Sequence, residues 1–183
     1  MQTRDFVLFA HGAFGGGISG RTALQKKIYF LGIMLGENHG FSPHYYGPYS
    51  AQVADANSEL KSLNYLKEEV NVYGWDHQGF EMVRYDYSLT EDGQKLLQRK
   101  KKEYPEEWEK ILECANRIKD AGNLNYMELA MAAKAYMILK REGGKADRNT
   151  IKTVAEGLGW SIDETELDRA IDFLDKIHLA YWK

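Results

Sequence analysis

Hydrophobic residues recur at three- and four-residue intervals along several stretches of this chain, and this spacing predicts amphipathic helices. The first stretch runs from about Thr3 to Phe14, and the second from about Arg21 to Leu35. Ser50 is a favourable N-cap residue for a third helix. The apolar stripe of that helix consists of Val53, Ala56, Leu60 and Leu63. The chain is therefore predicted to begin with three helices.

After the third helix the spacing changes from helical to alternating. In LKEEVNVYGWDHQGFEMVRYDYSL, Val70 and Val72 alternate with polar residues, and a loop from Gly74 to Gly79 reverses the chain. Thr90 is then placed to cap a further helix. Three helices, a hairpin and a helix follow one another in the order of a winged helix-turn-helix module, which we place at residues 1–103.

Residues 104–183 are predicted to form a helical subdomain. Pro105 suits the first position of a helix, and two further helices are expected near 148–158 and 163–177. A helix at 126–140 is apolar over much of its circumference, which predicts a place at the centre of the subdomain or in a dimer interface. Because winged-helix regulators commonly dimerise through added helices, we predict a homodimer. The expected fold class is mainly α with a small β hairpin, and one alternative for this subdomain is a second, wingless helix-turn-helix-like unit.

Composition places the chain among ordinary globular proteins. Of its 183 residues, 44% are hydrophobic and 28% are charged. No apolar run is long enough to span a membrane, and the single cysteine, Cys114, favours a reducing cytoplasm and is expected in the core. The formal net charge is −3, so a basic surface for nucleic acid would have to be local.

The segment Gly15–Thr22, GGGISGRT, differs by one residue from a phosphate-binding P-loop, because Arg21 stands at the lysine position. A P-loop joins a buried strand to a helix, and the preceding VLFA is too short for such a strand. We therefore expect no nucleotide here. The segment is instead predicted to be a flexible connection between two helices, with Ser19 as the N-cap of the second.

No catalytic constellation appears at a recognisable spacing, and we predict neither enzymatic activity nor a cofactor. His39 and His44 lie five residues apart without a neighbouring cysteine or acid, so no metal site is expected. Tyr45, Tyr46 and Tyr49 are predicted to pack a turn against the second helix, and contact with bases or a partner is the alternative.

Two blocks of the sequence resemble a known family. GRTALQKKIYFLG and FSPHYYGPYSAQV, followed by LKSLNYL, are similar to the YwgA-like family and, more distantly, to the Panacea-type (SocA-like) antitoxin domain. The matching positions are Gly20, Arg21, Leu24, Gln25, Lys26, Ile28, Tyr29, Phe30, Tyr46, Gly47, Pro48, Tyr49, Ser50, Leu60 and Leu63. YSLTEDGQKLL is also shared with winged-helix regulators of the MarR type. The resemblance covers about residues 12–97 and implies a winged-helix-like module; the antitoxin relatives imply regulation through protein contacts.

Two functions follow as hypotheses, and both are non-catalytic. The first is a transcriptional regulator or antitoxin-like factor that binds DNA, with the third helix as recognition helix. The alternative is a winged fold that binds an acidic protein partner. Gly47, Pro48 and Ser50 would set the entry to the third helix, and the basic run Arg99–Lys102 is a further phosphate candidate. The predicted DNA- or partner-binding residues are Arg21, Lys26, Lys27, Ser50, Gln52, Asn57, Trp75 and Arg84, with His77 beside Trp75 at the hairpin tip.

Overall fold

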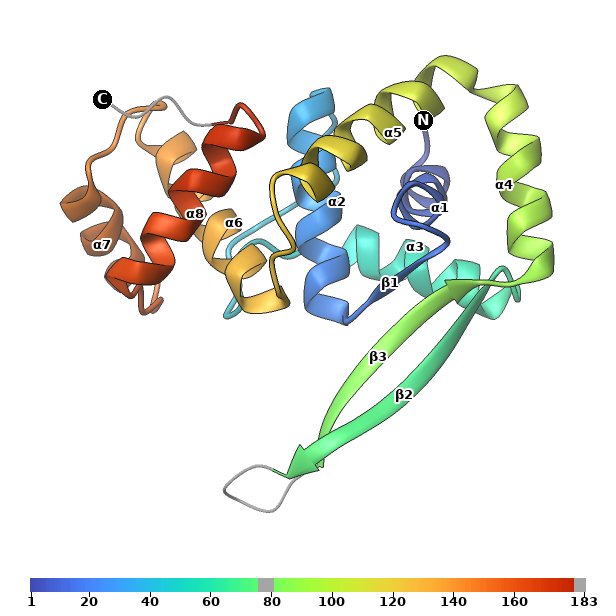
Figure 1. Ribbon diagram of the computed structural model, residues 1–183, viewed down its shortest axis with the longest axis horizontal. Helices are drawn as coiled ribbons and strands as arrows, with labels where there is room; N and C mark the ends of the chain where they lie inside the picture. Colours follow the sequence, from blue (N-terminus) through green and yellow to red (C-terminus); the bar gives the residue numbers. More distant parts are fainter. Residues whose placement is uncertain (76–80, 180–183) are drawn as a thin grey trace.

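The chain is mainly helical and has one small antiparallel sheet (Figure 1). The computed structural model describes residues 1–75 and 81–179. Within these residues the helices are α1 Thr3–Ala13, α2 Arg21–Leu35, α3 Ala51–Ser62, α4 Glu91–Glu103, α5 Pro105–Asp120, α6 Tyr126–Arg141, α7 Arg148–Gly157 and α8 Glu164–Lys176. The strands are β1 Gly17–Ser19, β2 Leu66–Trp75 and β3 Glu81–Leu89. The predicted mainly α fold with a small hairpin is confirmed.

The sheet is ordered β1-β3-β2, and both pairings are antiparallel. β2 and β3 pair from Leu66↔Leu89 to Trp75↔Glu81, with an irregularity between Val72 and Gly74. The hairpin extends away from the helices (Figure 1). Its loop, residues 76–80 with His77, and residues 180–183 lie outside the described part of the chain.

Three residues of the glycine-rich segment form strand β1, and the N-cap of α2 is Gly20, so the prediction of a flexible connection capped by Ser19 is wrong. Residues Gly17–Ser19 pair with the free edge of β3, and Gly20 occupies the N-cap position of α2 without a side-chain hydrogen bond. The pairing needs a glycine, because a Cβ atom at Gly17 would lie 2.2 Å from the Tyr87 carbonyl oxygen. The prediction failed because the strand pairs with β3, about 70 residues later in the chain, and nothing in the local sequence indicates that partner.

The core is centred on α1, in which Phe6 to Ala10 are all fully buried. Such a helix is covered on every side, and here α3, α4 and α5 pack around it. Trp108 of α5 meets Phe9 edge-on, with ring centroids 5.5 Å apart. In α2, Leu24, Ile28 and Leu31 are buried, and Cys114 is buried as expected.

The two predicted domains share this core. The boundary at 103/104 coincides with the corner where α4 ends and α5 begins at Pro105 (Figure 1). Beyond it, α5 packs against α1 and α2, and α6 packs against α2 as well as α7 and α8. Because α6 is covered by helices of its own chain, its apolar composition does not require a second copy.

Two further expectations need correction. Leu63 is 50% exposed rather than part of the stripe, because α3 ends at Ser62. Tyr45 and Tyr46 are 72% and 46% exposed, so packing the turn against α2 is not their main role. No described helix is long and apolar enough to cross a membrane.

Candidate functional site

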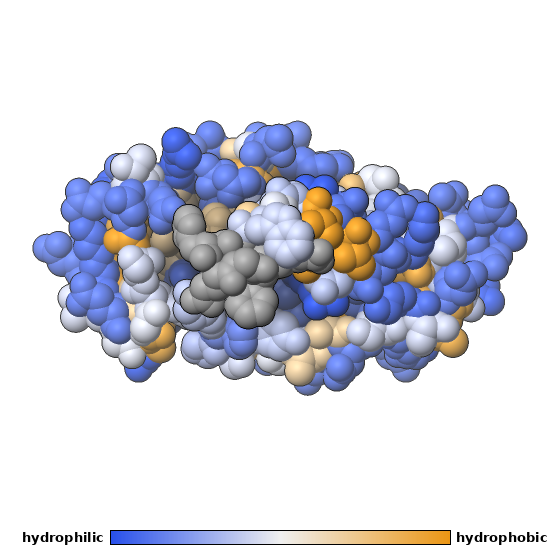
Figure 2. Space-filling model, turned by 90° about the horizontal axis from the view of Figure 1, so that it is seen from below, coloured by the Kyte–Doolittle hydropathy of each residue, from blue (hydrophilic) through white to orange (hydrophobic). Residues whose placement is uncertain are grey.

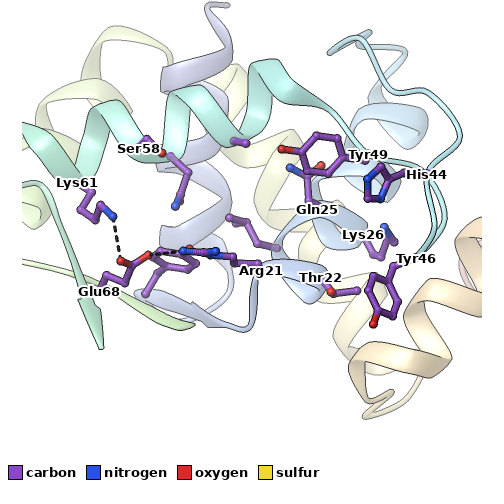
Figure 3. Close-up of a pocket in the computed structure, with 14 residues that line it drawn as sticks. Arg21, Thr22, Gln25, Lys26, His44, Tyr46, Tyr49, Ser58, Lys61 and Glu68 are labelled. Atoms are coloured by element: carbon purple, nitrogen blue, oxygen red, sulfur yellow. Dashed lines mark hydrogen bonds and ion pairs between the residues drawn. The ribbon is translucent and has the colours of Figure 1, made fainter. Parts of the chain in front are cut away.

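A cavity of about 400 Å³ opens between the first turns of α2, the side of α3, the segment 44–49 and the start of the hairpin (Figure 3). Its polar lining includes Arg21, Lys26, His44, Asn57, Lys61 and Glu68. Three of the eight predicted binding residues, Arg21, Lys26 and Asn57, therefore lie around one cavity.

Arg21 is fixed at the mouth of the cavity by two tyrosines and an acid. Its guanidinium carbon lies 3.4 Å from the centroid of the Tyr85 ring, and its Nε donates to the Tyr87 hydroxyl at 3.3 Å. Glu68 pairs with Arg21 at 3.8 Å and with Lys61 at 2.9 Å (Figure 3). Although desolvation opposes it, hydrogen bonds from Lys61 and Tyr87 hold the pKa of Glu68 below its usual value. The guanidinium is thus pre-oriented on a charged cluster.

Lys26 is buried, which contradicts its predicted role in surface contacts. The residue is 2% exposed, and its Nζ donates to the Pro48 carbonyl oxygen at 2.7 Å. Burial, with a smaller contribution from the nearby charge of Lys134, lowers the pKa of Lys26 to about 7. At neutral pH the amine is therefore partly uncharged, and as placed it cannot reach a flat macromolecular surface.

Two predicted residues of α3 hold the helix in place. Ser50 caps α3, as expected: its Oγ accepts from the Val53 amide at 3.1 Å and donates to the His39 carbonyl. Asn57, predicted to bind DNA or a partner, is instead buried, and its Oδ1 accepts from His11 Nε2 at 2.8 Å. Burial lowers the pKa of His11 to about 4, so this is a neutral, structural hydrogen bond.

Two other predicted binding residues, Gln52 and Lys27, differ from each other in solvent exposure. Gln52 is exposed on α3. Lys27 is half-buried, and its Nζ lies 4.6 Å from the centroid of the Phe14 ring. Burial and the charge of Lys119 on α5 lower the pKa of Lys27. Lys27 does not line the cavity that Arg21 and Lys26 share.

A second hollow, of about 390 Å³, lies beneath the hairpin and adjoins the cavity at Arg21, Thr22 and Tyr46. It is rich in aromatic residues and also contains Arg84, which pairs with Asp86 at 2.8 Å. The aromatic lining residues are Tyr46, Tyr73, Tyr85 and Tyr126. We call this hollow the tyrosine groove.

The hairpin beside the groove exposes several large side chains. Trp75 is 64% exposed and Tyr73 is 60% exposed. Val70, Val72 and Met82 are 55%, 52% and 37% exposed. Figure 2 shows hydrophobic side chains gathered beside the end of the hairpin. Trp75 is thus available for contact, as the sequence predicted.

The two histidines considered for a metal site, His39 and His44, lie in different environments. His39 is buried, and its ring centroid lies 4.3 Å from that of Phe6, whereas His44 is exposed beside Tyr49. Among residues 1–75 and 81–179, no three His, Cys, Asp or Glu side chains gather at metal-binding distance.

Sequence reasoning missed the contributions from distant parts of the chain. Tyr126, at the start of α6, lines the tyrosine groove. Lys134 of α6 lies close enough for its charge to lower the pKa of Lys26. No local pattern signals either contact. Glu68 and Tyr87 stand in the alternating pattern of the hairpin, and that pattern predicts strands but not the partner of Arg21.

Comparison with known proteins gives one informative similarity. No family model matches the chain. The chain is 28% identical over 165 residues to the uncharacterized protein YwgA of Bacillus subtilis (strain 168), with 88% of this chain and 89% of that protein covered. This similarity supports a relationship to YwgA-like proteins. An alignment of this length extends into residues 104–183, so the resemblance is wider than the expected 12–97.

Proposed function

We propose that this chain is a non-catalytic regulatory protein with a winged-helix-like module, and that it acts by binding a protein partner on its hairpin face. We define the hairpin face as the tyrosine groove together with the exposed side of β2. The order of α1, β1, α2, α3 and the β2–β3 hairpin supports the winged-helix part of the proposal. One feature departs from a helix-turn-helix: residues 36–50 join α2 to α3, far more than the usual three or four.

Charge argues against DNA as the partner. In a winged helix the third helix enters the major groove, but the side chains of α3 include Asp55, Glu59 and a single lysine. That lysine, Lys61, is paired with Glu68. The hairpin sequence 66–89 has two basic residues, Lys67 and Arg84, against five acids: Glu68, Glu69, Asp76, Glu81 and Asp86. Both elements would therefore repel phosphates, which dominate the affinity for DNA.

The observation that carries the proposal is the exposure of aromatic and aliphatic side chains on the hairpin. Tyr73 and Trp75 are both at least 60% exposed, and tyrosine, tryptophan and arginine are the side chains enriched in the energetic centres of protein interfaces. Arg21 and Arg84 lie in the same groove. A protein segment with an apolar centre fits this combination. The antitoxin-like resemblance also points to protein contacts.

Site-specific photo-crosslinking tests the proposal. A photoreactive phenylalanine analogue is placed at Tyr73 on the hairpin face, and in a control variant at exposed Glu109 on α5, in cells of the native host. We expect one protein to crosslink at Tyr73 and not at Glu109, and to be lost when Trp75→Ala is added. Capture of a second copy of this chain would identify the partner as itself, whereas equal capture at both positions would contradict the proposal.

A DNA-binding measurement distinguishes the proposed protein partner from the alternative, binding to DNA. Fluorescence anisotropy with random duplexes and duplexes from the chain's own operon is followed across a salt series. We expect no micromolar binding even at low salt. Binding that weakens steeply with salt would restore the DNA hypothesis, since counterion release produces that slope.

A further inference from the structure

The cavity of Figure 3 contains a buried ammonium group without a carboxylate partner. Lys26 is 2% exposed, and within the described residues its only hydrogen bond runs to the Pro48 carbonyl oxygen. An ammonium group has three donors, and buried charges in proteins are normally paired. Lys26 therefore has unused donors at a cavity wall, and its charged form has no carboxylate partner there.

The groups that surround Lys26 do not supply the missing anion. From α6, Lys134 adds a like charge, and His44 on the loop is an imidazole, which cannot supply a negative charge. The acid of the cavity, Glu68 on β2, already pairs with Lys61 and Arg21. The cavity lining thus contains three basic side chains against one acid.

The turn that holds Lys26 is itself fixed by α6. Gly47 has a φ of 85°, and a Cβ atom there would lie 3.0 Å from Lys134 Cγ and 3.5 Å from Lys26 Cε. The Pro48 carbonyl is the partner of the Lys26 amine. The amine is consequently positioned before any ligand arrives, which reduces the entropy lost on binding.

We propose that this cavity binds a small organic oxyanion, a phosphate or a carboxylate, with Lys26 as its buried cation and Arg21 as its second cation at the mouth. Thr22 of α2 and Asn57 and Ser58 of α3 supply neutral hydrogen-bonding groups to the cavity lining. Tyr46 and Tyr49 supply ring surface for the remainder of the molecule. A volume of about 400 Å³ lies within the range of small-ligand sites. This inference does not depend on the identity of the protein partner.

Thermal unfolding and calorimetry at low ionic strength test the site. The probes are inorganic phosphate, phenyl phosphate and citrate, each compared with sodium chloride of equal ionic strength. We expect at least one probe to raise the melting temperature by about 5 °C at saturation. Phosphate and carboxylate probes together distinguish the two sources of the oxyanion. An anion beside Lys26 favours its charged form, so binding at pH 7 should take up protons, measured in buffers of different ionisation enthalpy.

Three variants locate the binding. Lys26→Met should abolish binding and proton uptake, and Arg21→Gln should weaken affinity about tenfold or more. Lys102→Met, at an exposed lysine of α4, is the matched control and should bind as the wild type does. The proposal is overturned if no probe stabilises the protein beyond the chloride control, or if the Lys26 variant binds normally. If the Lys26 variant does not fold, the affinities of Arg21→Gln and Lys102→Met are compared instead, and equal affinities would overturn the proposal.

Discussion

Several polar side chains of α2 and α3 are buried and hydrogen-bonded within the chain. Asn57 accepts from His11, and Lys26 donates to the Pro48 carbonyl. A buried donor that loses its partner costs the full desolvation of that group. At the residue scale, then, side chains that look available for DNA in the sequence are part of the interior.

Replacement of Asn57 should destabilise the fold rather than affect a binding surface. Asn57→Ala leaves His11 Nε2 without an acceptor, in addition to His11 Nδ1, which already lacks a partner. We expect the free energy of unfolding to fall by roughly 2 kcal/mol. Chemical denaturation measures this, with Gln52→Ala on the exposed side of α3 as the control, expected to change it by less than about 0.5 kcal/mol.

Lys26 should make stability depend on pH in the alkaline range. Its pKa is about 7 in the folded protein and near 10.5 in the unfolded chain. Between these values the unfolded chain binds more protons, so this residue's cost to stability is full below pH 7 and disappears as pH rises toward 10.5. Lys26→Met should therefore stabilise the protein at pH 7 by roughly 2–4 kcal/mol, less the loss of the Pro48 hydrogen bond.

Denaturation of the wild type and Lys26→Met at pH 7 and at pH 10 checks this prediction. The gain should shrink at the higher pH, while Lys102→Met should show no such change. An equal gain at both pH values would mean that the Lys26 amine is not the group responsible.

At the scale of elements, β1 links the helices to the hairpin. It brings the start of α2, and with it Arg21, beside Tyr85 and Tyr87 of β3. The cavity and the tyrosine groove both border on Arg21. The three-residue strand β1 therefore positions Arg21, which contacts Tyr85, Tyr87 and Glu68.

A side chain at Gly17 should disturb this strand. Gly17→Ala places a Cβ atom 2.2 Å from the Tyr87 carbonyl oxygen, so backbone must move, at a cost of roughly 2 kcal/mol. Gly157→Ala in α7, where a Cβ atom meets nothing within 4 Å, is the control and should stabilise by about 0.5 kcal/mol. Thermal unfolding of both variants measures the difference, and a tolerated Gly17→Ala would argue against tight β1–β3 pairing.

At the scale of the whole molecule, the N-terminal module depends on helices from the second half. Trp108 of α5 covers Phe9 of α1, and the ring of Tyr136 on α6 lies 6.3 Å from that of Tyr29 on α2. Site residues also come from both halves, since Tyr126 completes the tyrosine groove. Residues on both sides of the predicted domain boundary at 103 therefore contribute to the core and to the candidate site.

The fragment 1–103 should not fold independently. Without α5 and α6 it would expose the buried faces of α1 and α2, and exposed apolar surface of this kind favours loosely packed states. We expect poorly dispersed amide spectra and no cooperative thermal transition for the fragment, against a single transition for the full chain. A well-dispersed spectrum of the fragment would show that 1–103 is an autonomous domain.

Local features could be predicted from the residues alone: the amphipathic helices, the hairpin, and the helix starts at Ser50, Thr90 and Pro105. Periodicity and capping depend on neighbours within a turn or two, so they can be read from short stretches. The tertiary structure alone decided that GIS is a strand, that Lys26 and Asn57 are buried, and that Arg21 meets Glu68. Burial, strand pairing and cavity formation depend on residues distant in the chain, and no short stretch contains that information.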